Sequence, residues 1–120
     1  PAIAQILAHL PVSFPVPIFI VQHIAAGFIE GFVHWLQKHC SLPIHLASHG
    51  EKALNGHVYI APDKCNMEVR QDNLIILHSS DQQPLVGHLF HSLAYTYGPE
   101  AIGVILTGMG KDGADSLLLM

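Results

Sequence analysis

Two polar residues stand where the sequence predicts that apolar strands end. His23 follows the apolar run 17–22, and Asp112 lies in the glycine-rich stretch after the apolar run 101–107. An imidazole in such a place can act as a general base, worth roughly 10²–10⁴-fold in rate. A nearby carboxylate could orient it, as the third member of a nucleophile–base–acid triad. Because open α/β sheets bind ligands at the carboxyl ends of their strands, we expect His23 and Asp112 to converge there.

Both residues also have simpler explanations. The chain contains ten histidines, and most histidines in proteins are surface or satisfied core groups. Asp112 could merely cap a helix and complement its dipole. The run Gly108-x-Gly110-x-x-Gly113 matches the dinucleotide-binding fingerprint, but several elements precede it, whereas that fingerprint normally belongs to the first strand–helix turn. Nucleotide binding therefore stays open as an alternative.

Histidine pairs raise the question of a metal site. His45 and His49 are four residues apart, and His88 and His91 are three apart. The first pair falls partly in a predicted strand, so its members would not share a helix face. The second pair could chelate, but neither pair has a carboxylate or cysteine partner at diagnostic spacing. We expect no metal and no organic cofactor.

The apolar patterning predicts alternating strands and helices. A chain of this kind is typical of an α/β layered domain with a mostly parallel sheet and an antiparallel hairpin insertion. The three strands from 57 to 77 are separated by turn signals and suggest an antiparallel ribbon. Helices are predicted at 1–10, 28–39 and 85–97, strands at 17–22, 44–47, 57–61, 67–70 and 74–77, and a polar loop at 78–84.

Composition limits the classes of function. Half of the 120 residues are hydrophobic, 12% are charged and the formal net charge is −4, which argues against disorder and against an electrostatic nucleic-acid partner. No apolar run reaches the ~18 residues of a membrane span. Cys40 and Cys65 form no diagnostic motif, which favours reduced thiols in a cytosolic protein. We expect residues 1–120 to be part of a larger domain, with a strand before Pro1 and further elements after Met120.

Three segments together resemble a known family. The segments FIVQHIAAGF at 19–28, NGHVYIAPDKCNMEV at 55–69 and AIGVILTGMGKDGA at 101–114 are similar, in order and spacing, to the catalytic domain of the CheB-type chemotaxis protein-glutamate methylesterases. The resemblance implies a serine hydrolase on a three-layer α/β fold. Such enzymes remove methyl groups from glutamate esters on receptor signalling helices, and they can also deamidate glutamines.

The resemblance also assigns residues. His23 matches the catalytic histidine, Asp112 the triad aspartate, and Met109 the residue whose backbone amide helps to bind the oxyanion. The nucleophilic serine has no match in this sequence, because in the family it lies in a Ser-Thr-Gly-Gly turn directly before the helix that begins here at Pro1. The supplied chain alone is therefore expected to be inactive. The loop at 82–87 reads QQPLVG where the family usually has HRPSVD, which alters side chains near the presumed substrate cleft.

These features imply a cytoplasmic carboxylic-ester hydrolase acting on methylated chemotaxis receptor helices, with an N-terminal receiver domain as a further candidate partner. The alternative is a non-catalytic binding module, either a nucleotide binder that uses the glycine run or a pseudoenzyme that serves as an interaction domain. The residues upstream of Pro1 would distinguish the two.

Overall fold

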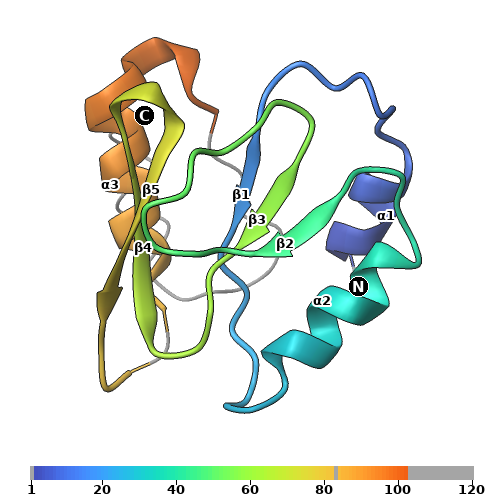
Figure 1. The fold of residues 1–120 in the computed structure, drawn as a ribbon, viewed down its shortest axis with the longest axis horizontal. Helices are drawn as coiled ribbons and strands as arrows, with labels where there is room; N and C mark the ends of the chain where they lie inside the picture. Colours follow the sequence, from blue (N-terminus) through green and yellow to red (C-terminus); the bar gives the residue numbers. More distant parts are fainter. Residues whose placement is uncertain (1, 83, 103–120) are drawn as a thin grey trace.

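A computed structural model of the chain describes residues 2–82 and 84–102. Its elements confirm the alternation predicted from the sequence (Figure 1). Short 3-10 turns occupy Gln71–Asn73 and Gly98–Glu100. The helices are α1 (Ala2–Ala8), α2 (Ile29–Gln37) and α3 (Val86–Tyr97), and the strands are β1 (Ile18–Ile20), β2 (Ile44–Leu46), β3 (Val58–Ile60), β4 (Cys65–Arg70) and β5 (Leu74–Ser79).

The parallel sheet of the described residues has the strand order β1-β3-β2. Ile18 of β1 and Ile44 of β2 both pair with Val58 of β3, so β3 is the central strand. The prediction that residues 57–61 join an antiparallel ribbon is therefore wrong. Residues 58–61 form a continuous apolar run buried on both faces, which is typical of a central parallel strand.

Side chains of β3 alternate between two hydrophobic cores. Val58 and Ile60 pack with helices α1 and α2, whereas Tyr59 faces the hairpin and α3. All three residues are no more than 1% exposed. Figure 1 shows the resulting layers, with α1 and α2 on one face of the sheet and the β4–β5 hairpin with α3 on the other. This is the layered α/β architecture that the sequence predicts, with a mostly parallel sheet and a hairpin insertion.

The hairpin pairs β4 with β5 in antiparallel register from Cys65–Ser79 to Arg70–Leu74. Asp72 and Asn73 turn the chain with φ of 63° and 59°, in the left-handed region that Asn and Asp tolerate better than most residues.

Helix α3 satisfies backbone groups of β4. Ser92 Oγ accepts the Val69 N–H at 3.0 Å, and Thr96 Oγ1 donates to the Val69 carbonyl at 2.9 Å. These two bonds cover a strand edge that would otherwise offer unpaired groups to another chain. Gly98, with φ of 56°, ends the helix where the sequence predicts.

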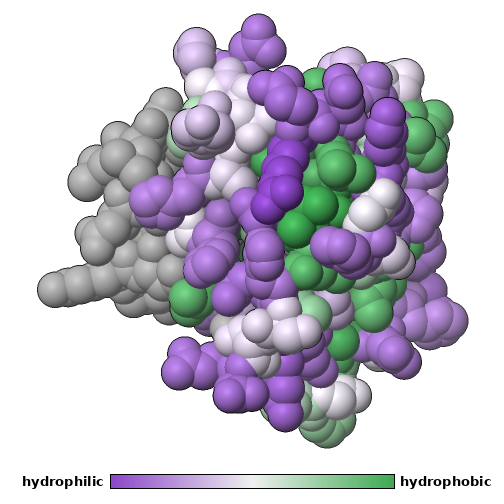
Figure 2. Space-filling view, turned by 60° about the vertical axis from the view of Figure 1, so that its left-hand side comes forward, coloured by the Kyte–Doolittle hydropathy of each residue, from purple (hydrophilic) through white to green (hydrophobic). Residues whose placement is uncertain are grey.

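The surface on this side of the molecule is mixed. Figure 2 shows polar side chains over much of it, framing an apolar area near the middle. Glu68 and His78 lie diagonally across β4 and β5, two residues out of direct register, and His78 Nε2 contacts Glu68 Oε1. Arg70 Nη2 donates to the same oxygen at 3.2 Å.

Within the described ranges, no helix is long and apolar enough to cross a bilayer.

The pairing of Glu68 with His78 predicts a pH-dependent contribution to stability. The hydrogen bond from His78 lowers the pKa of Glu68 from its ordinary value of 4.5, with a smaller contribution from Arg70. A lowered folded-state pKa means that the stabilisation is present above pH 4.5 and is lost as the pH falls through the folded-state pKa. We expect Glu68→Gln to lower the melting temperature by on the order of 2 °C at about pH 6. The difference should shrink as the pH is lowered from about 6 to about 3, and an equal difference at both pH values would contradict the assignment.

Candidate functional site

His23 lies at the carboxyl edge of the parallel sheet, just beyond β1, as the sequence predicts. The residue is exposed, and its Nε2 lies 2.8 Å from the backbone carbonyl oxygen of Pro84. Because a carbonyl can only accept, Nε2 carries the proton in this arrangement, and the lone pair of the neutral ring is on Nδ1. The geometry thus holds an accessible imidazole in one tautomer, which suits a general base.

The loop after His23 is held by Asp63. Asp63 Oδ2 accepts the Gly27 N–H at 2.8 Å. Asp63 belongs to the turn that follows β3, and the strand ends are joined there by a bond of 3.0 Å from the Ala61 N–H to the Ile20 carbonyl. The carboxylate of Asp63 is therefore bonded to the backbone of the loop that follows His23.

Ser80 and Leu85 are bonded to the β3–β4 turn. The Ser80 N–H donates to the Lys64 carbonyl at 2.8 Å, and the Leu85 N–H donates to Asn66 Oδ1 at 3.0 Å. Pro84, whose carbonyl contacts His23, is fully buried. Pro84, a residue of the altered stretch, thus contacts the histidine that matches the catalytic one in the resemblance.

Asp112 and Met109 lie outside the described residues, so their convergence with His23 stays a prediction. Among described groups that could act as nucleophiles, two are engaged in the fold. Ser92 Oγ donates to the Leu89 carbonyl at 2.8 Å as well as accepting from β4. Burial raises the pKa of the Cys40 thiol, which donates to the Leu42 carbonyl and is therefore a poor nucleophile.

The two histidine pairs considered as metal ligands have different surroundings in the structure. His45 Nε2 lies 2.7 Å from Nδ1 of His57, and the two rings stack. His49 instead accepts the Leu77 N–H through Nδ1 at 3.0 Å. His88 and His91 lie on α3, both exposed. Over residues 2–82 and 84–102, no three His, Cys, Asp or Glu side chains gather as a metal ion would require.

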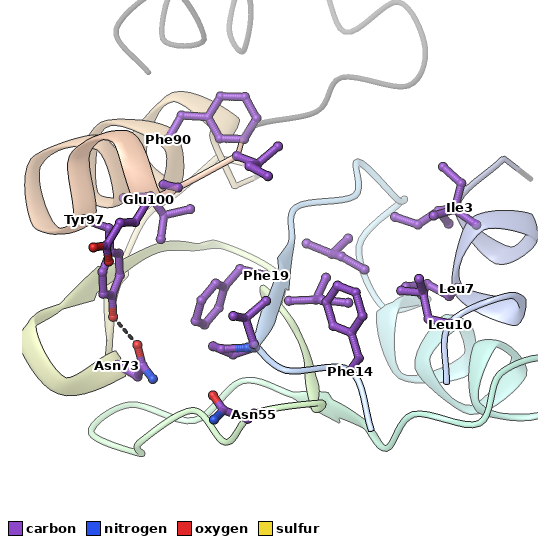
Figure 3. Close-up of a pocket in the computed structure, with 18 residues that line it drawn as sticks. Ile3, Leu7, Leu10, Phe14, Phe19, Asn55, Asn73, Phe90, Tyr97 and Glu100 are labelled. Atoms are coloured by element: carbon purple, nitrogen blue, oxygen red, sulfur yellow. Dashed lines mark hydrogen bonds between the residues drawn. The ribbon is translucent and has the colours of Figure 1, made fainter. Parts of the chain in front are cut away.

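A separate apolar cavity of about 580 Å³ runs along β1 (Figure 3). Residues from α1 lie on one side of it and residues from α3 on the other, with Phe14 and Phe19 between them. Its polar members include Asn55, Glu100 and Tyr97, whose hydroxyl bonds to Asn73. Burial, more than any other factor, raises the pKa of that hydroxyl. The described residues of its wall do not include His23, so the cavity is distinct from the carboxyl-edge site.

Comparison with known proteins decides the family. The model of the CheB methylesterase family matches residues 1–120. The chain belongs to the CheB methylesterase family. It is 48% identical to a protein-glutamate methylesterase/protein-glutamine glutaminase of Nitrosospira multiformis, over 100% of this chain and 35% of that protein. A protein of the same name from Syntrophus aciditrophicus is also 48% identical, over 97% of this chain and 34% of the relative.

A solved structure confirms the fold. The CheB methylesterase catalytic domain of Thermotoga maritima superposes with a TM-score of 0.88 at 31% identity, covering 98% of this chain and 66% of that one. The family resemblance stated from the sequence is therefore confirmed. The chain spans about a third of the length of the two relatives above, 35% and 34%.

Sequence reasoning missed the Pro84 carbonyl, which contacts the His23 ring, and the Asn66 side chain, which accepts the Leu85 N–H next to it. The Pro84 carbonyl is a backbone atom and has no signature of its own. Asn66 stands in the quoted segment NGHVYIAPDKCNMEV, but a single asparagine in a strand carries no functional signal. Only its position as the second residue of a hairpin that begins near the carboxyl edge of the sheet could have suggested it.

Proposed function

We propose that the full-length protein is a cytoplasmic protein-glutamate methylesterase that hydrolyses glutamate methyl esters on chemotaxis receptor helices and also deamidates receptor glutamines. The observation that carries the proposal is the family match over residues 1–120, together with the names of its relatives. The placement of His23 at the carboxyl edge of the sheet supports it. A receiver domain is proposed as the regulatory partner.

In the proposed mechanism, a serine outside these 120 residues attacks the ester carbonyl. His23 takes the serine proton and returns it to the departing methanol. The backbone amide of Met109 helps to stabilise the tetrahedral oxyanion, a kind of donor worth roughly 10²–10³ in turnover. Asp112 holds His23 and stabilises the imidazolium that forms. A water molecule, activated by His23, then releases the glutamate carboxylate.

Release of labelled methanol tests this proposal. The full-length protein is incubated with a receptor cytoplasmic fragment that carries methyl-labelled glutamate esters, and volatile label is counted over time. We expect release that depends on protein concentration and needs no added metal or organic cofactor. A folded full-length protein that binds the receptor fragment but releases no methanol would favour the non-catalytic binding module instead.

A further inference from the structure

Two large apolar side chains are exposed in the segments that meet at His23. Phe28 is 67% exposed and Leu85 is 38% exposed. Leu85 directly follows Pro84, whose carbonyl oxygen lies 2.8 Å from the His23 ring. Phe28 closes the turn after His23, where its N–H donates to the Ala25 carbonyl at 3.1 Å. We call Phe28 and Leu85 the apolar rim.

Hydrogen bonds to neighbouring residues fix the two halves of the apolar rim. Asp63 Oδ2 accepts the N–H of Gly27, next to Phe28, at 2.8 Å. Asn66 Oδ1 accepts the N–H of Leu85 itself at 3.0 Å. Because Asp63 and Asn66 are only three residues apart in the chain, the backbones of Phe28 and Leu85 are held at a defined separation.

Leu85 is an unfavourable residue for its place in the helix. It is the N-cap of α3, with φ of −97° and ψ of 128°, and its side chain makes no capping hydrogen bond. Ser, Thr, Asp and Asn are preferred there, because their side-chain oxygen accepts an N–H of the first turn. This chain has QQPLVG at 82–87 where the family usually has HRPSVD, so the leucine replaces a serine. Helix stability does not explain the leucine, and such breaks of a local rule are expected at functional sites.

The altered stretch also removes charge from the surroundings of His23. Residues 82–87 contain no ionisable side chain, whereas the usual pattern has a histidine, an arginine and an aspartate. A partner with charged side chains next to its reacting group would find no opposite charge in this stretch. A partner with apolar side chains there would bury them against the apolar rim.

We propose that Leu85 and Phe28 are specificity-determining residues, which select target glutamates that have an apolar side chain one helical turn away. The inference rests on the proposed function, in which the substrate is a glutamate methyl ester on a receptor helix. A glutamate that reaches His23 brings the surface of its own helix against the residues around the imidazole. Its neighbours on that surface are the residues three and four positions away. Apolar residues there bury area against the apolar rim, whereas charged ones lose hydration.

Two synthetic helical peptides test this selection on the full-length protein. Each carries one central glutamate γ-methyl ester in an alanine-rich sequence. The residues four positions before and after the ester are leucine in one peptide and alanine in the other. Leucine and alanine are both strong helix formers, so the peptides differ in apolar surface far more than in helicity. Methanol release gives kcat and KM for each peptide with the wild-type protein and with the variants.

The wild-type protein should have a roughly three- to tenfold higher kcat/KM for the leucine-flanked peptide, mainly through a lower KM. Leu85→Ser should raise KM for that peptide and bring the two kcat/KM values together. Leu85→Met keeps an apolar side chain and should keep the preference. Leu54→Ser is the matched control, because Leu54 is 56% exposed and precedes β3, at the amino end of the sheet. This variant should keep the wild-type preference.

The melting temperature separates selection from packing. Leu85→Ser introduces a preferred N-cap residue and should keep or raise the melting temperature. A marked fall would show that the leucine supports the fold and would contradict the proposal. Phe28→Ser gives an independent reading from the other half of the apolar rim and should also lower the preference. The proposal is overturned by equal kcat/KM values in the wild-type protein, by a preference that survives Leu85→Ser, or by an equal loss in Leu54→Ser.

Failure of the proposed function would give a different result. If the wild-type protein released no methanol from either peptide or from the receptor fragment, the esters would stay intact. Binding of the two peptides, each with a fluorescent label, is then compared by anisotropy. Tighter binding of the leucine-flanked peptide that depends on Leu85 would support the apolar rim without catalysis, and equal binding of both peptides would overturn it.

Discussion

Replacing His23 with alanine should reduce methanol release by the full-length protein by at least about 10⁴-fold while leaving it folded. The physical reason is that triad members act as a unit, so that removal of the base costs nearly as much rate as removal of all members. His23 is exposed and lies beyond β1, so its loss removes little buried surface. Methanol release is measured alongside the circular dichroism of the same sample.

A second histidine provides the control for this variant. His39 lies just after α2, at the opposite end of that helix from the loop that carries His23, and bonds back to the carbonyl of Trp35. His39→Ala should therefore keep turnover near the wild-type level. Wild-type turnover in His23→Ala would show that another group is the base. An equal loss in both variants would show that the assay reports a general loss of structure.

Replacing Gly56 with alanine should destabilise the fold by roughly 2 kcal/mol or more, the largest stability effect that we predict. Gly56 has φ of 78°, which side chains rarely adopt. An added Cβ would lie 3.0 Å from the carbonyl oxygen of Phe14 and 3.2 Å from that of Val12. Both oxygens are backbone atoms of the α1–β1 connection. The Gly56 N–H is itself bonded to the Val16 carbonyl of that connection at 3.0 Å, so a shift of either backbone segment would cost hydrogen-bond energy.

The same substitution at Gly31 should have the opposite sign. Gly31 lies inside α2, and a Cβ there would meet nothing within 4 Å. Alanine should therefore stabilise the helix by about 0.5–1 kcal/mol. Thermal unfolding of the two variants, followed by circular dichroism, should move the midpoint in opposite directions. Equal destabilisation by both substitutions would mean that the turn at Gly56 imposes no special backbone geometry.

How the sequence predicted the elements can be seen at particular positions. The run from Pro17 to Gln22 and the spacing of apolar residues in 28–39 and 85–97 predicted β1, α2 and α3, because the period of an apolar pattern follows directly from backbone geometry. Gly98 predicted the end of α3 for the same kind of local reason. The apolar run 17–22 also predicted, from local sequence alone, that His23 follows the end of a strand, and the structure has it just beyond β1.

Strand pairing was decided at the tertiary level. The segments 57–61, 67–70 and 74–77 are all short and are separated by turn signals, so the sequence suggested one ribbon. The structure places Val58–Ile60 between β1 and β2 instead. Which strands become neighbours depends on contacts between residues far apart in the chain, and a short apolar strand carries no local record of its partner.

The sequence by itself determined the family, the alternation of strands and helices, and the position of His23 after a strand, because each of these follows from residue types at fixed spacings. Only the tertiary structure decided what holds that histidine. Pro84 and Asn66 reach it from segments 61 and 43 residues away along the chain, one through a backbone carbonyl and the other through the neighbouring N–H. Backbone groups are the same at every residue, so their use in a site is a consequence of where the folded chain brings them.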